Sequence, residues 1–164
     1  MNPNPYIKQY QKNQIETATP EKILIMLYDG AIQYLNVVKA TMNEPRNAEN
    51  IQKVHNKMIG AQRIITEFMN TLDMEVGGEV AQNLYDLYNY LYNRLVEANI
   101  KKDVSMVEEV LAHIKELKET WVQAINISQK EKVQSKNHSV SHISIAGDDD
   151  EEEEDYYEKS ETEA

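Results

Sequence analysis

The chain has 164 residues and a formal net charge of −11, and it contains no cysteine. This length supports one domain with a single core and a tail, and the lack of cysteine excludes disulfides and thiolate metal sites. No apolar run approaches the roughly 18 residues that a membrane span needs, and the stretch Met1–Pro5 lacks the features of a signal peptide. We therefore expect a cytoplasmic protein without membrane insertion.

Negative charge is concentrated near the end of the chain. Residues 131–164 hold twelve acidic residues against three lysines, a net charge of −9, which leaves −2 for residues 1–130. The body of the chain shows no basic stripe, and this disfavours nucleic-acid binding. With only five glycines and one phenylalanine, the composition favours an all-α fold.

Residues 1–18 are predicted to form a flexible N-terminal arm. Two prolines are followed by Tyr6, Ile7 and Tyr10 among polar neighbours. These side chains are spaced like anchors for a partner surface, although a frayed terminus with incidental tyrosines is an equal alternative.

The first helix is predicted to begin after Thr19, because threonine is a favourable N-cap and Pro20 suits the first helical position. Its apolar face continues to about Met42, before an Asn-Glu-Pro stretch. Gly30 in the helix interior indicates a close crossing with another helix, since glycine at an exposed interior position costs about 1 kcal/mol relative to alanine.

The second helix is predicted to be capped by Asn47 and to run to about Leu72. Its apolar stripe includes Ile51, Val54 and Met58, and further apolar residues lie on both sides of this stripe. The second helix is therefore apolar over more than the arc that a surface helix needs.

The third helix, predicted over residues 77–99, carries two apolar stripes. Its leucines lie within about 60° of Val80 on a helical projection, which indicates a core face. A second stripe lies at roughly 80° to 160° and consists of Tyr85, Tyr88, Tyr92 and Val96. This second stripe either packs on a neighbouring helix of the same bundle or contacts another chain.

The fourth helix is predicted to be capped by Asp103 and to end near Ser128. Because the loops are short, we expect residues 19–129 to form an antiparallel up-down-up-down four-helix bundle. Residues 130–164 are predicted to be a disordered acidic tail, since the block of like charges at residues 148–155 cannot bury apolar area. A solvated tail is favoured over a mimic of an acidic partner or an interaction tag.

No group of residues indicates catalysis. Di-iron bundles need Glu-x-x-His pairs on two helices, but the residues three positions before His55 and His113 are glutamine and valine. The lysine and glycine after His55 are out of register with those of a histidine phosphotransfer domain. Gly-rich phosphate loops, Gly-x-Ser-x-Gly motifs and cysteine nucleophiles are also absent. We expect a protein that is not an enzyme and holds no metal or cofactor; histidine phosphotransfer and generic dimerisation are the alternatives.

Several runs of residues, taken together, are similar to the flagellar secretion chaperone FliS family. The similarity covers about residues 5–127 in unbroken order and is carried by these runs: Thr17–Ala31, Ala61–Ile65, Thr71–Asp73, Val80–Tyr90, Glu97–Asn99 and Glu119–Trp121. It implies a non-catalytic four-helix bundle that binds the disordered C-terminal region of flagellin in the cytosol. It further implies that the bundle prevents premature polymerisation and delivers flagellin to the flagellar type III export gate. The acidic tail lies outside this resemblance.

The resemblance also implies which positions contact the client. The arm would contribute Tyr6, Ile7 and Tyr10, and the third helix would contribute Tyr85, Tyr88, Tyr92 and Val96. The second-helix positions Ile51, Val54 and Met58 either line a groove or belong to the core. On this basis Tyr88→Asp or Tyr92→Asp is expected to weaken client binding and to leave the bundle folded. A homodimer formed without client is the alternative use of the surplus apolar surface.

Overall fold

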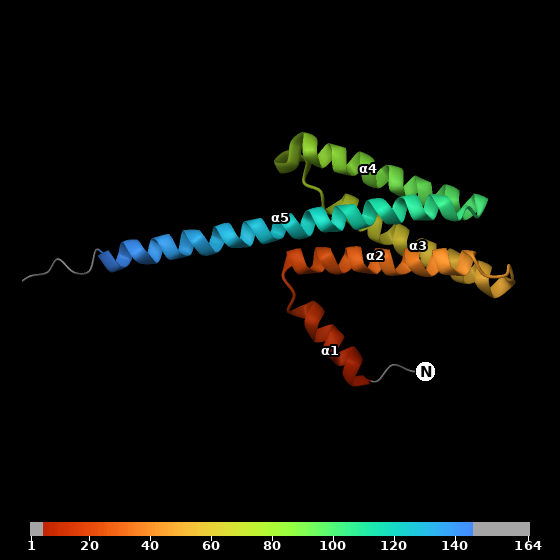
Figure 1. Cartoon of the computed structure of the whole chain (residues 1–164), viewed down its shortest axis with the longest axis horizontal. Helices are drawn as coiled ribbons and strands as arrows, with labels where there is room; N and C mark the ends of the chain where they lie inside the picture. The colour runs from red at the N-terminus through yellow and green to blue at the C-terminus, as the bar shows by residue number, and fades with distance from the viewer. Residues whose placement is uncertain (1–4, 146–164) are drawn as a thin grey trace, which may run out of the picture. The chain divides into compact units, whose positions relative to one another are not determined.

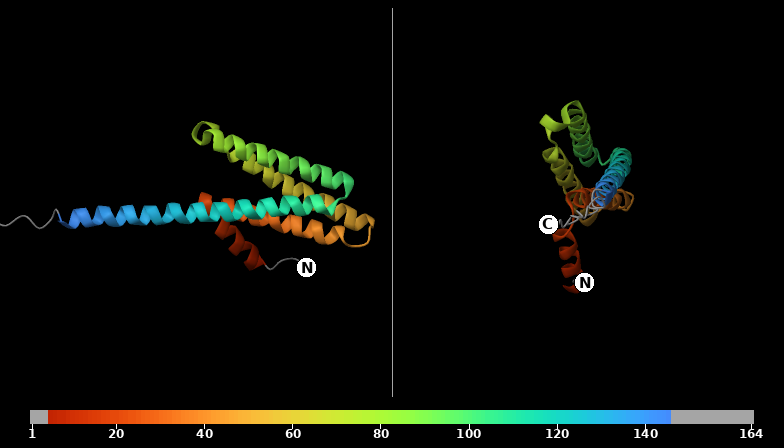
Figure 2. Two further views of the ribbon diagram at one scale, coloured as in Figure 1. Left: turned by 45° about the horizontal axis from the view of Figure 1, so that its top comes forward. Right: turned by 90° about the vertical axis from the view of Figure 1, so that its left-hand side faces the viewer.

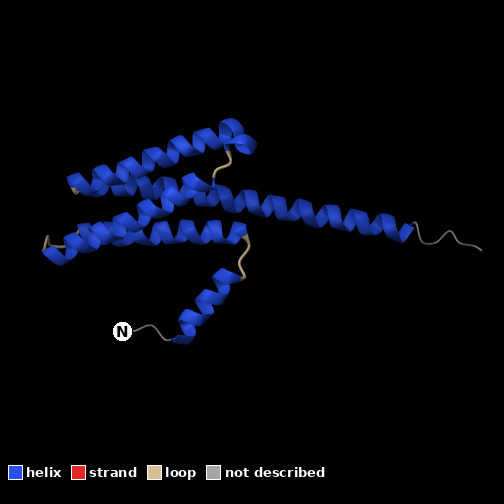
Figure 3. Ribbon diagram, turned by 180° about the vertical axis from the view of Figure 1, so that it is seen from behind, coloured by secondary structure: helices blue, strands red, loops and turns tan. Residues whose placement is uncertain are grey.

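The computed structural model describes residues 5–145, and this part of the chain contains five helices and no strand (Figures 1 and 3). The helices are α1 (Pro5–Glu16), α2 (Pro20–Met42), α3 (Ala48–Thr71), α4 (Met74–Lys101) and α5 (Val104–Ile145). The chain divides into two compact units, Met1–Ile125 and Asn126–Ala164. The first unit contains α1 to α4 and the first part of α5, and the prediction of an all-α fold is confirmed.

Three of the four predicted helix starts agree with the structure. Thr19 Oγ1 accepts a hydrogen bond from the backbone N–H of Lys22 at 3.3 Å, and Asn47 Oδ1 accepts one from the N–H of Asn50 at 2.8 Å. The side chain of Asp103 caps α5 in the same way. Each cap satisfies a backbone donor that the first helical turn leaves without an intrahelical partner.

Helices α2, α3, α4 and the first part of α5 lie alongside one another (Figure 2). One hydrophobic core fills the space between them. Consecutive helices among these four run in opposite directions (Figure 1). The predicted antiparallel four-helix arrangement therefore describes this part of the first unit, and α1 is an additional helix. Large side chains that are fully buried come from all four helices: Tyr28, Leu35, Met58, Ile65, Phe68, Tyr88, Leu91, Leu95, Val107 and Ile114.

Two glycines allow α2 and α3 to approach each other closely. A Cβ atom at Gly30 would lie 3.3 Å from Cδ1 of Ile64, so the close crossing expected from the sequence is present. A Cβ atom at Gly60 would lie 2.8 Å from the Tyr34 ring, a second close approach between the same two helices. Larger residues at these two positions would hold α2 and α3 further apart. The two glycines therefore allow the tight packing of this interface.

A kink at Gly78 divides α4 into a short first turn and a long second segment. Gly78 has φ 50° and ψ −127°, a backbone conformation that residues with a Cβ atom avoid. The preceding turn begins at Met74, three residues before the predicted start, because Asp73 Oδ1 accepts hydrogen bonds from the N–H groups of Glu75 and Val76, each at 3.0 Å.

The end of α5 differs from the prediction. The helix does not stop near Ser128 but continues to Ile145, so the expectation of disorder from residue 130 is wrong for residues 130–145. The apolar periodicity fades after Ile125, but no glycine or proline occurs before Gly147, and nothing in this stretch interrupts helical hydrogen bonding. The acidic block at residues 148–155 lies outside the described residues.

Most of the predicted N-terminal arm is helical. Residues Pro5–Glu16 form α1, in which no residue is buried. This agrees with a segment outside the packed core, whereas the flexibility of the arm stays a prediction. None of the described helices is long and apolar enough to cross a membrane.

Candidate functional site

The core face of α4 is rotated toward the tyrosine side of the helix relative to the predicted leucine stripe. Tyr88 is only 2% exposed and Ala81 is also buried, whereas Val80, the centre of the predicted core face, is 68% exposed. Of the two alternatives for the second stripe, packing inside the bundle therefore holds for Tyr88, and its assignment as a client contact, which the resemblance implied, is corrected. The long segment of α4 packs between α3 and α5, so the arc facing both neighbours includes Tyr88 together with Leu91 and Leu95.

Tyr88 is part of a buried aromatic cluster that joins three helices. The Tyr28 and Phe68 rings stack with centroids 4.3 Å apart, and the Phe68 and Tyr88 rings lie 5.3 Å apart. The hydroxyl groups of Tyr28 and Tyr88 are hydrogen-bonded at 2.5 Å, so each buried polar group has a partner. Burial raises the pKa of both phenols above the ordinary tyrosine value. The cluster is a structural element and offers no surface to a partner.

Two of the candidate contact residues predicted on the second helix are also buried in the core. Val54 is 4% exposed and Met58 is fully buried, because the apolar stripe of α3 faces α2 and α4 at once. The open question of groove or core is therefore settled as core for Met58. Val54 belongs to the core and in addition lines a small pocket together with Ile51, which is 42% exposed.

The remaining predicted residues of α4 form a strip beside α3. Asn99 Nδ2 lies 3.2 Å from Nδ1 of His55, which places the Asn99 side of α4 next to α3. Tyr85, Tyr92 and Val96 share this side of α4, since they precede Asn99 at helical spacing. Tyr85 is 37% exposed, and the other two are half-buried.

On α3, Ile59 lies one turn after His55 and is half-buried on the same side. We call the strip formed by Ile59, Tyr85, Tyr92 and Val96 the α3–α4 ridge. In the part of the chain that the structure describes, no ion pair joins α3 to α4. The ridge can therefore accept an apolar partner without any ionic contact being broken.

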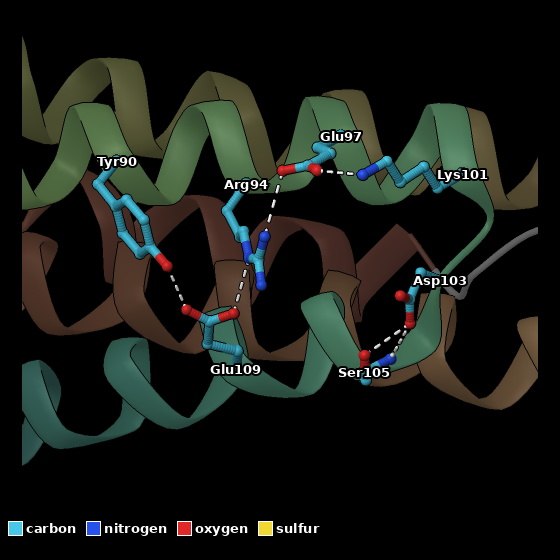
Figure 4. A network of polar contacts seen from close by, with 7 residues as sticks. All are labelled: Tyr90, Arg94, Glu97, Lys101, Asp103, Ser105 and Glu109. Carbon is cyan, nitrogen blue, oxygen red and sulfur yellow. Dashed lines mark hydrogen bonds and ion pairs between the residues drawn. The ribbon is translucent and has the colours of Figure 1, made fainter.

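The opposite side of α4 carries a network of polar contacts to α5 (Figure 4). Arg94 Nε donates to Glu109 Oε2 at 2.7 Å, and the hydroxyl of Tyr90 donates to the other oxygen of the same carboxylate. Arg94 Nη1 also contacts Glu97 at 3.2 Å, and Glu97 is paired with Lys101 at 2.5 Å. The two contacts with Glu109 tie this side of α4 to α5, whereas the two contacts of Glu97 lie within α4.

The network shifts the titration of its members. Hydrogen bonds from Tyr90 and then from Arg94 hold the pKa of Glu109 below the ordinary glutamate value. The hydrogen bond from Lys101 does the same for the pKa of Glu97, and the bond to Glu109 raises the pKa of Tyr90. At neutral pH the carboxylates of Glu97 and Glu109 are therefore charged. Each of the two cations, Arg94 and Lys101, is paired with at least one of them.

The predicted arm residues lie on α1 and are exposed. Tyr6 is 82% exposed, Tyr10 is 64% exposed and Ile7 is 53% exposed. The Tyr10 hydroxyl accepts a hydrogen bond from Nε2 of Gln14 at 2.9 Å. The structure thus leaves these side chains outside the core, as an anchor role requires, while their role as anchors stays a prediction.

Sequence reasoning missed the contacts that join distant residues. The sequence contains no signal for the pairing of Arg94 with Glu109, because charged residues at exposed helix positions usually face solvent. Gly60 opposite Tyr34 could have been noticed, since an interior glycine in a helix predicts a close approach. Among the described residues, no cluster of histidine and acidic side chains could hold a metal ion.

Comparison with known proteins adds an independent observation. A family model described as "Flagellar protein FliS" matches residues 2–128. The flagellar secretion chaperone FliS of Bacillus subtilis is 33% identical over 129 residues, which cover 79% of this chain and 92% of that protein. The protein of the same name from Vibrio cholerae is 37% identical over 121 residues (72% and 84% covered), and that from Salmonella typhimurium is 32% identical over 136 residues (78% and 93%).

Proposed function

Because the chain belongs to the FliS family of flagellar proteins, we propose that it is an export chaperone whose client is the C-terminal region of flagellin. In this proposal it binds the client in the cytosol, prevents premature polymerisation and delivers it to the gate of the flagellar type III export apparatus. The relatives are named as chaperones of flagellar secretion, which implies a non-catalytic role.

The observation that carries the proposal is the α3–α4 ridge. It presents two partly exposed tyrosines and a half-buried valine on the side of α4 that faces α3, and a half-buried isoleucine on the His55 side of α3. Tyrosine provides a large contact area at a small rotamer cost and keeps a hydrogen-bonding hydroxyl, which suits a recognition surface. An amphipathic client segment that becomes helical can place its apolar face against such a strip.

Binding a disordered client requires a large apolar contact, because the contact must offset the entropy lost when the client becomes ordered. We therefore expect a flagellin C-terminal peptide to bind the full chain, to gain helicity and to show a large negative heat-capacity change. Isothermal titration calorimetry at several temperatures measures both quantities. A peptide without detectable binding would refute the proposed client.

A matched pair of tyrosines tests the location of the surface. Tyr92 lies on the α3–α4 ridge, whereas Tyr90 lies on the α5 side of the same helix. We expect Tyr92→Ser to weaken client binding about tenfold, which corresponds to roughly 1.4 kcal/mol, and Tyr90→Ser to leave the affinity nearly unchanged. The helical circular dichroism of both variants serves as the folding control.

The reverse pattern, with Tyr90→Ser weakening binding and Tyr92→Ser having no effect, would move the client to the α4–α5 side. Sedimentation with and without the peptide separates client binding from self-association. A dimer that persists unchanged at saturating peptide would show that the ridge serves a second copy of the chain instead.

The arm has its own test. Since Tyr6, Ile7 and Tyr10 are exposed rather than packed into the core, we expect them to contact client directly. Removal of residues 1–16 should then lower the affinity for the peptide. A gain in affinity would instead indicate that the arm competes with client for the same surface.

A further inference from the structure

A pocket of about 240 Å³ lies where the α2–α3 loop meets the turn between α4 and α5. Its apolar wall is formed by Met42, Pro45, Ile51 and Val54. A cavity of about 150 Å³ is enough for one benzene-sized group. The pocket therefore has room for one apolar side chain and part of its backbone, and it is too small for a helix.

Two cationic side chains, Arg46 and Lys102, also line this pocket. Burial and the nearby charge of Arg46 lower the pKa of Lys102. Lys102 Nζ donates to Oδ1 of Asn99 at 2.6 Å. In the part of the chain that the structure describes, neither cation forms an ion pair with an acidic side chain, although Glu44 is also part of the lining. Two neighbouring positive charges without a paired acid favour an anionic ligand.

The backbone at Lys102 is a second, independent observation. Lys102 has φ 53° and ψ 43°, and among the described residues it is the only one other than glycine with a positive φ. Helices that end in this left-handed conformation usually place glycine there, because a side chain is strained at that position. Lys102 thus adopts a conformation that suits glycine, and its side chain lines the pocket.

We propose that this pocket binds the chain end of the client, with an apolar side chain at or next to the client terminus in the pocket and the terminal carboxylate between Arg46 and Lys102. The inference rests on the proposed function, which makes the client a C-terminal region. Charge complementarity supports it, since a chain end carries a carboxylate directly beside its last side chains. Ile51, which was singled out in the sequence, then contacts this end of the client.

The test compares two peptides of the flagellin C-terminal region that differ only in the chemical group at the C-terminus. One peptide ends in the free carboxylate and the other in a C-terminal amide, which removes the charge and preserves the shape. Because hydrogen bonds to charged groups are stronger than neutral ones, we expect the amide to bind the wild-type full chain about tenfold more weakly. Isothermal titration calorimetry measures both affinities.

Three variants assign the difference to the pocket. In Arg46→Gln and in Lys102→Gly, the preference for the free carboxylate should fall or disappear. Lys102→Gly should also unfold at the same or a higher temperature than the wild type, because glycine relieves the left-handed strain. Lys53→Gln removes an exposed charge of α3 that does not line this pocket, and it should retain the full preference.

The outcomes separate this inference from the proposed function. Equal binding of the two peptides to the wild type would overturn the inference alone. A preference that survives in both Arg46→Gln and Lys102→Gly would overturn it as well. If the variants weaken both peptides equally, the cations bind an internal acidic side chain and the inference is wrong. Failure of both peptides to bind at all would overturn the proposed function and this inference with it.

Discussion

The two sides of α4 are built from different chemistry. On the side of α5, Arg94 and Tyr90 hold both oxygens of Glu109, and Glu97 extends the network. On the side of α3, the α3–α4 ridge is apolar, and one 3.2 Å contact between Asn99 and His55 lies at its end. Specific polar contacts fix α4 to α5, while the opposite side of α4 forms no ion pair with α3 within the described residues. The two sides of one helix therefore differ in the kind of contact that each can offer.

A second contrast lies along α4 itself. Tyr88 is buried and bonded to Tyr28, but Tyr85 and Tyr92, which lie about one turn before and after it, are partly exposed. A difference of some 40° to 60° around the helix axis separates a structural tyrosine from a candidate contact residue. Residue type and spacing alone do not distinguish the two roles.

The largest expected effect comes from Tyr88→Ala. Removal of this fully packed ring should lower the free energy of unfolding by about 3–5 kcal/mol, the usual cost of truncating a buried aromatic side chain. Urea denaturation followed by circular dichroism measures the change. A loss below about 1 kcal/mol, which is typical of a surface position, would place Tyr88 on the surface and restore the predicted stripe.

A smaller effect is expected from Tyr88→Phe, which keeps the ring but removes one hydrogen-bond partner of the Tyr28 hydroxyl; the side chain of Trp121 is another. Loss of a buried hydrogen bond costs about 0.5–1.5 kcal/mol, and Tyr28→Phe/Tyr88→Phe loses the bond between the two hydroxyls only once. The double variant should therefore lose less stability than the sum of the two single variants. A double variant that loses the sum of the single losses would show that the hydroxyls act independently.

The polar side of α4 is expected to respond to pH. The pKa of Glu109 is lowered in the folded state, so its contribution to stability is present above the ordinary glutamate pKa of about 4.3 and is lost as the pH falls through the folded value. Glu109→Gln should therefore flatten the decrease of thermal midpoint between neutral and acidic pH. An unchanged acid profile would show that the network contributes nothing to stability.

The smallest effect on stability is expected from Tyr85→Ala on the α3–α4 ridge. More than a third of this side chain is exposed, so its truncation should lower the free energy of unfolding by less than about 1 kcal/mol. The same denaturation experiment measures it against Tyr88→Ala. If the two variants were equally unstable, the distinction between buried and exposed tyrosines of α4 would fail.

Local sequence signals predicted most of the fold. Thr19, Asn47 and Asp103 cap helices through contacts within three residues, and such contacts are visible in the sequence. The end of α5 is not visible in the sequence, because the apolar periodicity fades after Ile125 while the helix continues to Ile145. A helix without glycine or proline can continue after it leaves the core.

The candidate site was predicted less well, because it depends on how helices are rotated against each other. The rotation of α4 that buries Tyr88 follows from its packing against Phe68 and Tyr28, which are 20 and 60 positions earlier in the chain. Likewise, no periodicity in either segment places Arg46 near Lys102. Contacts of this kind require the three-dimensional arrangement.

The buried pair of tyrosine hydroxyls also sets an alkaline limit for the protein. Unfolded tyrosine ionises near pH 10, and burial raises the folded pKa of Tyr28 and Tyr88 above that value. The stability that this pair contributes is complete below about pH 10 and is lost as the pH rises toward the folded values. In an alkaline titration, the ultraviolet absorbance of the tyrosinate form and the loss of helical circular dichroism should therefore share one final, cooperative step.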